Sequence, residues 1–128
     1  MRHRLAALCV AALALPISAG AAPGLTVTFS ATTHTPKINA KWFYTVRALR
    51  AGKPARATIT SQIVDPYGGV HPVPFGCCTR NVVNHPFRGM FRDYAQFPPE
   101  SQGFKLTFRV TVRALGVKRV LTYWVKPR

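Results

Sequence analysis

Residues 104–113 read FKLTFRVTVR, and this stretch decides the fold. Apolar and polar side chains alternate along it, and the apolar set is Phe104, Leu106, Phe108, Val110 and Val112. A period of two is typical of a strand with one buried face, because successive side chains leave opposite sides of the pleated backbone. The β-branched and aromatic residues in the stretch also favour a strand. We therefore predict a strand with one face in a core and a basic face outside.

The next residues predict the partner of this strand. Leu115 and Gly116 form a short loop, and glycine supplies the positive φ that a tight hairpin needs. This loop pairs Val112 with Arg119, Val110 with Leu121, Phe108 with Tyr123 and Leu106 with Val125. The other face pairs Arg113 with Lys118, Arg109 with Thr122, Thr107 with Trp124 and Lys105 with Lys126. A slip by one residue would turn the apolar set outward, so the pattern fixes the register. A four-residue loop would keep the same register.

Further strands are expected along the rest of the chain, at residues 25–30, 38–48, 57–64, 70–73 and 87–93. Turns rich in glycine and proline separate them, and no segment has a sustained helical period. The apolar face of the second strand is expected to include Ile38 and Ala40. Short strands at this spacing indicate an all-β protein with two packed antiparallel sheets.

The first 21 residues are predicted to be a signal peptide. A charged start, an apolar run from Leu5 to Ile17 and the small residues 19–21 fit that pattern. The apolar run is short for a permanent membrane anchor. We therefore expect residues 22–128 to form one secreted or cell-surface domain, with no transmembrane anchor after cleavage.

The charge is strongly unbalanced. The chain has 18 Lys and Arg and three acidic residues, and removal of Arg2 and Arg4 would leave a net charge of +13. Such a charge favours an anionic environment or partner. The alternative is a soluble surface that is basic because the genome favours arginine.

Several segments resemble a known class of domain. The runs KWFYTVR at 41–47, GKP at 52–54 and TIT at 58–60 are similar to the early strands of bacterial immunoglobulin-like domains. Residues 87–93 and the strand from Phe104 resemble their later half. The resemblance implies an immunoglobulin-like antiparallel β-sandwich of about seven strands. It also implies a binding or spacer module at the cell envelope, in a mostly uncharacterised group of small exported proteins.

Cys77 and Cys78 are adjacent, and an exported protein would normally hold them as disulfides. Neighbouring Cα atoms are about 3.8 Å apart, which is short of the usual disulfide span of about 4.4 Å or more. A bond between the two would be a strained ring, and pairing with another chain or two free thiols are the alternatives. With His71 and His85 nearby, the pair also suggests a redox or copper-handling site, although the spacing fits no established zinc pattern.

Catalysis is not expected. The acids are Asp65, Asp93 and Glu100, of which Asp65 and Asp93 are expected at a turn or a strand end. No nucleophile elbow, phosphate-binding glycine loop or metalloprotease helix is present. We predict no enzyme activity and no cofactor.

Residues 87–97 mix aromatic and basic side chains, which could stack bases or sugars. The interpretation that we favour places Phe87, Phe91 and Phe97 in the core instead.

The predicted site is the outer face of the final hairpin. Its members are Lys105, Arg109, Arg113, Lys118, Trp124 and Lys126. We expect this set to bind an anionic cell-envelope polymer or a protein partner, and charge alone also admits nucleic acid.

Overall fold

The computed structural model describes residues 24–77 and 83–128, so the predicted signal peptide and Cys78 lie outside the described residues. Within these ranges the chain forms nine strands and one short 3-10 helix, η1 at Pro99–Ser101. The strands are β1 (Leu25–Ala31), β2 (Trp42–Arg50), β3 (Lys53–Pro54), β4 (Arg56–Val64), β5 (Val70–Pro72), β6 (His85–Arg88), β7 (Met90–Ala95), β8 (Leu106–Ala114) and β9 (Val117–Val125). The described part of the chain has no helix that is long and apolar enough to cross a membrane.

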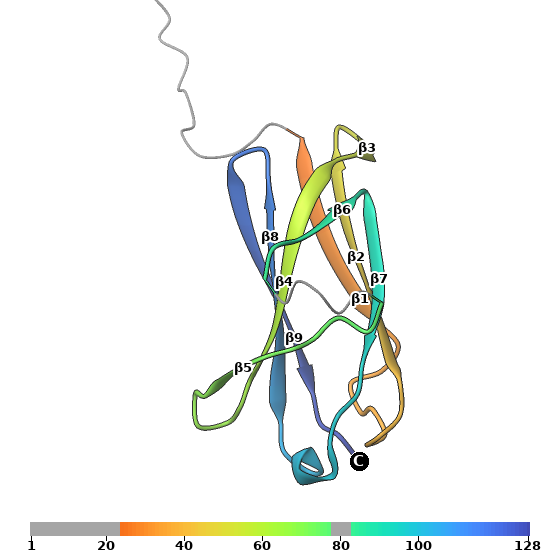
Figure 1. Cartoon of the computed structure of the whole chain (residues 1–128), viewed down its shortest axis with the longest axis vertical. Helices are drawn as coiled ribbons and strands as arrows, with labels where there is room; N and C mark the ends of the chain where they lie inside the picture. The colour runs from red at the N-terminus through yellow and green to blue at the C-terminus, as the bar shows by residue number, and fades with distance from the viewer. Residues whose placement is uncertain (1–23, 78–82) are drawn as a thin grey trace, which may run out of the picture.

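The strands form two antiparallel sheets that pack face to face (Figure 1). In the first sheet β2 lies between β1 and β7, and β3 pairs with the end of β2. In the second sheet the order is β4, β8, β9, and both β5 and β6 pair with β4. The predicted all-β sandwich is confirmed, and seven of the described strands have four or more residues.

Aromatic side chains from both sheets fill the core. The ring of Trp42 on β2 meets Phe97 edge-on, with centroids 5.6 Å apart, and Phe108 on β8 at 5.1 Å. The indole N–H of Trp42 donates to the carbonyl of Thr33, so the one polar atom of this ring is paired. Burial of a large apolar side chain stabilises a fold by about 1.5–3 kcal/mol, so this cluster holds the sheets together. Phe91 and Phe97 are buried and Phe87 packs against them, which confirms the core interpretation of these three residues.

The hairpin of β8 and β9 has the register that the alternation predicted. Leu115 and Gly116 adopt φ angles of 54° and 71°, and two successive positive values are characteristic of a type I′ turn. One detail was wrong: β8 begins at Leu106, and Phe104 is 45% exposed rather than buried. The chain is still leaving η1 at this point, because the Phe104 N–H donates to the carbonyl of Ser101.

The second strand is shorter than predicted. It begins at Trp42, and residues 38–40 form a turn in which Asn39 has a φ of 58°. Ile38 and Asn39 donate their backbone N–H groups to the carbonyls of Arg128 and Phe97 instead of to a strand partner. Ala40 is consequently exposed, and Ile38 is half-buried. The strands predicted at 25–30, 57–64 and 70–73 are observed within one residue at each end.

The strand predicted at 87–93 is in fact two strands in different sheets. β6 pairs with β4, and β7 pairs with β2, so the chain crosses the sandwich at Gly89. Gly89 has a φ of +73°, and a Cβ there would lie 2.7 Å from the Cβ of Pro54. Its N–H donates to Ala55 and its carbonyl accepts from Ala48, which fixes the crossing point.

Candidate anion-binding face

The outer surface of the second sheet is hydroxyl-rich and basic. We call it the outer face, and its outward-pointing residues are Arg56, Thr58, Thr60 and Gln62 on β4, Arg88 on β6, Thr107, Arg109, Thr111 and Arg113 on β8, and Lys118, Val120, Thr122 and Trp124 on β9. Alternation places them there, because the residues between them, such as Ile59, Phe108 and Val110, are fully buried. The core therefore dictates which side chains face solvent on these strands.

Four of the six predicted site residues lie within the paired part of β8 and β9. Arg113 lies opposite Lys118, Arg109 opposite Thr122, and Trp124 opposite Thr107, in the predicted register. Trp124 is 45% exposed, as expected for an outward-facing ring. Their role in binding stays a prediction.

The other two predicted residues flank the ladder. Lys105 precedes β8 and Lys126 follows β9, so the expected cross-strand pair of these two lysines is not part of the ladder. The ammonium of Lys105 lies over the Trp124 ring instead, 5.4 Å from its centroid. The N–H of Lys126 donates to the carbonyl of His34, because residues 34–38 run beside the end of β9. Lys105 and Trp124 thus form a cation–π pair at one end of the outer face.

Arg109 is held in place by its neighbour on β4. Its Nε and Nη2 atoms both donate to the side-chain oxygen of Gln62, at 3.2 and 2.8 Å. This fork leaves the positive charge uncompensated, because the amide oxygen carries no formal charge. The guanidinium is therefore oriented and remains available to an anion.

Two basic residues of this face were missed by sequence reasoning. Arg56 and Arg88 lie directly opposite each other on β4 and β6. Only the crossing at Gly89, which assigns β6 to this sheet, brings Arg88 here. No local sequence pattern predicts that crossing.

Two hollows follow this face. One has a volume of about 360 Å³ and is lined by Thr60, Gln62, Val83, Asn84, Arg109, Thr111, Arg113, Lys118 and Val120. The second, of about 440 Å³, includes Arg56, Thr58 and Arg113. Arg113 lines both hollows, so the two hollows adjoin on the outer face.

The acidic residues of the chain all lie elsewhere. Asp65 is in the turn after β4, as expected, and Glu100 is in η1. Asp93 was expected at a turn or a strand end, but it lies within β7 and is only 3% exposed. Since these are the three acids of the whole sequence, no carboxylate neutralises the outer face.

Asp93 instead anchors the segment that contains the first cysteine. Its two carboxylate oxygens accept the backbone N–H groups of Gly76 and Cys77, each at 2.9 Å. Burial raises the pKa of the neighbouring Tyr44 hydroxyl well above its ordinary value, the hydrogen bond to Ser61 lowers it, and the charge of Asp93 raises it further. Asp93 thus ties β7 to the segment after β5, and the Tyr44–Ser61 hydrogen bond links the two sheets beside it.

The residues of the predicted redox or copper site have separate surroundings. His71 Nε2 pairs with the Asp65 carboxylate at 2.8 Å, and the half-buried His85 ring packs between Phe75 and Phe91. Cys77 is disulfide-bonded, and Cys78, one of the partners considered for it, lies outside the described residues. Residues 24–77 and 83–128 contain no group of three His, Cys, Asp or Glu side chains that could hold a metal ion.

Comparisons with known proteins give little beyond overall shape. No protein-family model and no curated protein matches the sequence. One similar solved structure is a DUF4426 family protein from Pseudomonas aeruginosa PAO1, with 19% identity, 82% of this chain and 93% of that chain covered, and a TM-score of 0.49. Another is a DUF4466 family protein from Parabacteroides merdae, with 17% identity, 83% and 44% coverage, and a TM-score of 0.40. Both families are of unknown function, and neither likeness supports an argument about activity.

Proposed function

We propose that this protein is an exported, non-enzymatic binding module that holds an anionic polymer of the cell envelope on the outer face. The observation that carries the proposal is the concentration of Arg56, Arg88, Arg109, Arg113 and Lys118 on one sheet surface without an acidic residue. The predicted signal peptide supports the location. A protein partner with an acidic surface would use the same charges.

The clustering of basic residues on the outer face lowers the stability of the sheet, and this cost supports a role for the cluster in binding. Arg113 lies opposite Lys118 and Arg56 opposite Arg88, and like charges directly across strands destabilise a sheet by about 0.2–1 kcal/mol each. Threonine occupies the neighbouring outward positions, such as Thr58 and Thr111, so neutral strand residues fit this surface. A bound polyanion would remove the repulsion.

The chemistry of the face suits a flexible polymer with regularly spaced phosphates or carboxylates. Guanidinium groups bind such oxygens through paired N–H donors, and threonine hydroxyls add hydrogen bonds to neighbouring oxygens. Binding should weaken as salt rises, because each neutralised phosphate releases condensed counterions.

The test is affinity for a teichoic-type polymer, polyphosphate and DNA across a salt series. The variant Arg113→Thr/Lys118→Thr should bind more weakly than the wild type and show a shallower salt dependence. The matched control is Arg47→Thr/Arg92→Thr, which removes the same charge from the exposed surface of the other sheet.

The outcomes separate a defined site from a general charge effect. If both double variants lose affinity equally, net charge and not the outer face governs binding. If neither variant changes affinity for any of the three polymers, the proposed site is wrong. If the protein prefers DNA to both envelope-type polymers, the outer face remains the binding site but its ligand is a nucleic acid.

A further inference from the structure

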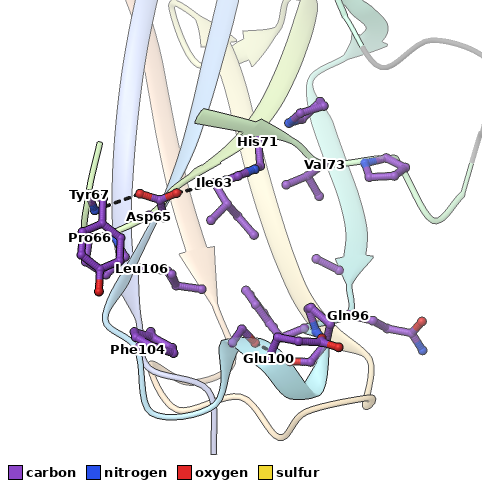
Figure 2. Close-up of a pocket in the computed structure, with 16 residues that line it drawn as sticks. Ile63, Asp65, Pro66, Tyr67, His71, Val73, Gln96, Glu100, Phe104 and Leu106 are labelled. Carbon is purple, nitrogen blue, oxygen red and sulfur yellow. Dashed lines mark hydrogen bonds and ion pairs between the residues drawn. The ribbon is translucent and has the colours of Figure 1, made fainter. Parts of the chain in front are cut away.

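A different kind of hollow lies where β4 ends and β8 begins (Figure 2). It has a volume of about 530 Å³, within the range of about 300–1,000 Å³ that is usual for small-molecule sites. One side is formed by the turn after β4 and by β5, and the other by the segment between β7 and β8. Figure 2 shows Ile63, Val73 and Leu106 lying between the turn of Asp65 and Tyr67 and the segment that carries Gln96.

The lining of this groove is mostly apolar. Val73, Phe97 and Leu106 form buried parts of its wall, and proline rings contribute further apolar surface. Tyr67 and Phe104 also line it, and they are 88% and 45% exposed. A ligand that covers these two rings would remove their apolar surface from water, and this burial would favour binding.

The charge of the groove is opposite to that of the rest of the surface. Among the described residues no Lys or Arg lines it, although these residues number 18 in the chain, and two of the three acids do line it. The carboxylate of Asp65 is already engaged by the Tyr67 and Gly69 N–H groups and by His71. The Glu100 side chain is exposed, and it has no hydrogen bond or ion pair with another described residue.

We propose that this groove binds a small molecule with an apolar body and a single cationic group, such as an ammonium or amidinium. The apolar body would lie on Val73, Leu106 and Phe104, and the cation would pair with Glu100. The basic residues of the outer face oppose such a cation, and at physiological salt the screening length of about 8 Å limits the range of that repulsion. This site is independent of the proposed polymer-binding face.

The experiment uses three probes of one shape on the mature protein: phenylbutylamine, phenylbutanol and phenylbutyrate. Affinities are measured by calorimetry, and backbone amide NMR shifts locate the site. The amine should bind about fivefold more tightly than the alcohol, the factor that one charge pair at about 4 Å contributes in water. The carboxylate should bind most weakly, with all shifts centred on residues 63–73 and 96–106.

Two variants test the role of Glu100. Glu100→Gln should remove the preference for the amine and leave alcohol binding unchanged. Thr26→Lys is the control, because it raises the net charge by the same amount on the exposed face of β1 and should keep the preference. A third variant, Phe104→Ala, should weaken all three probes, since it removes apolar surface and no charge.

The proposal is overturned by any of three results. These are no binding of the amine at millimolar concentration, equal affinity of the wild type for the three probes, and amide shifts centred away from the groove. An unchanged preference in Glu100→Gln also contradicts the assigned cation partner. None of these results bears on the proposed polymer-binding site, because Asp65 and Glu100 line the groove and are not part of the outer face.

Discussion

Arg56 on β4 and Arg88 on β6 lie directly opposite each other, two guanidinium groups in one cross-strand pair. The two residues are 32 positions apart in the sequence and meet only because the chain changes sheets at Gly89. Both side chains are exposed, so they can spread into solvent, but their repulsion still opposes the pairing of β4 with β6.

Arg88→Glu should therefore raise stability and lower polymer affinity at once. The new carboxylate would lie opposite Arg56 and replace repulsion with attraction, a gain of about 0.5–1 kcal/mol in the free energy of unfolding. Urea denaturation measures the gain, and the polyphosphate titration measures the loss of affinity. Arg88→Thr, which removes the charge without reversing it, should lie between. If Arg88→Glu gains stability but binds polyphosphate as tightly as the wild type, Arg88 is not part of the binding site.

Asp93→Asn should destabilise the fold by about 1–3 kcal/mol. Each oxygen of the carboxylate accepts one backbone N–H, from Gly76 and Cys77, and an amide can replace only one of these acceptors. Thermal unfolding measures the effect. Glu100→Gln makes the same chemical change at an exposed position and should stay within about 0.5 kcal/mol of the wild type. Equal effects of the two changes would contradict the anchoring role of Asp93.

Leu115→Asn should stabilise the hairpin by up to about 1 kcal/mol. Leu115 has a φ of 54° and is 45% exposed, so the change relieves strain and gives up little burial. Gly116→Ala is the counterpart: a Cβ there meets no atom within 4 Å, but the φ of +71° is unfavourable for alanine. It should destabilise by about 1–2 kcal/mol, the strain of that conformation alone. Opposite signs in urea denaturation are the expected outcome, and a loss in both variants would argue against the type I′ turn.

The loss of folding stability at acidic pH should depend on Asp65. The hydrogen bond from His71, followed by the Gly69 N–H, lowers the pKa of Asp65 below its ordinary value of 3.8. The unfolded chain therefore takes up this proton at a higher pH than the folded chain, and stability rises with pH in that interval. The contribution is complete above the ordinary value and is lost as pH falls through the folded pKa.

Urea denaturation of the wild type and Asp65→Asn at a series of pH values checks this sign. The stability difference that the two proteins show at pH 5 should shrink as the pH falls below about 4. A difference that persists unchanged to pH 2 would show that the ionisation of Asp65 is not involved.

The best-predicted part of the candidate site is the one whose determinants are local. Residues 104–125 predicted the register of β8 with β9, and with it the positions of Arg109, Arg113, Lys118 and Trp124. Strict alternation and a two-residue loop leave only one pairing that turns Leu106, Phe108 and Val110 and their partners Val125, Tyr123 and Leu121 toward the core. Phe104 departs from the pattern because its N–H donates to the carbonyl of Ser101 and β8 begins only at Leu106.

The sequence by itself determined the strand periodicity, the hairpin register and the unbalanced charge, since each depends on neighbouring residues or on simple counts. Only the tertiary structure decided that β6 and β7 join different sheets, that Arg88 faces Arg56, and that Asp93 is buried beneath Gly76 and Cys77. The groove near Glu100 likewise needs segments from both sheets. These features depend on contacts between residues far apart in the chain, and a local pattern carries no information about which distant strand supplies the partner.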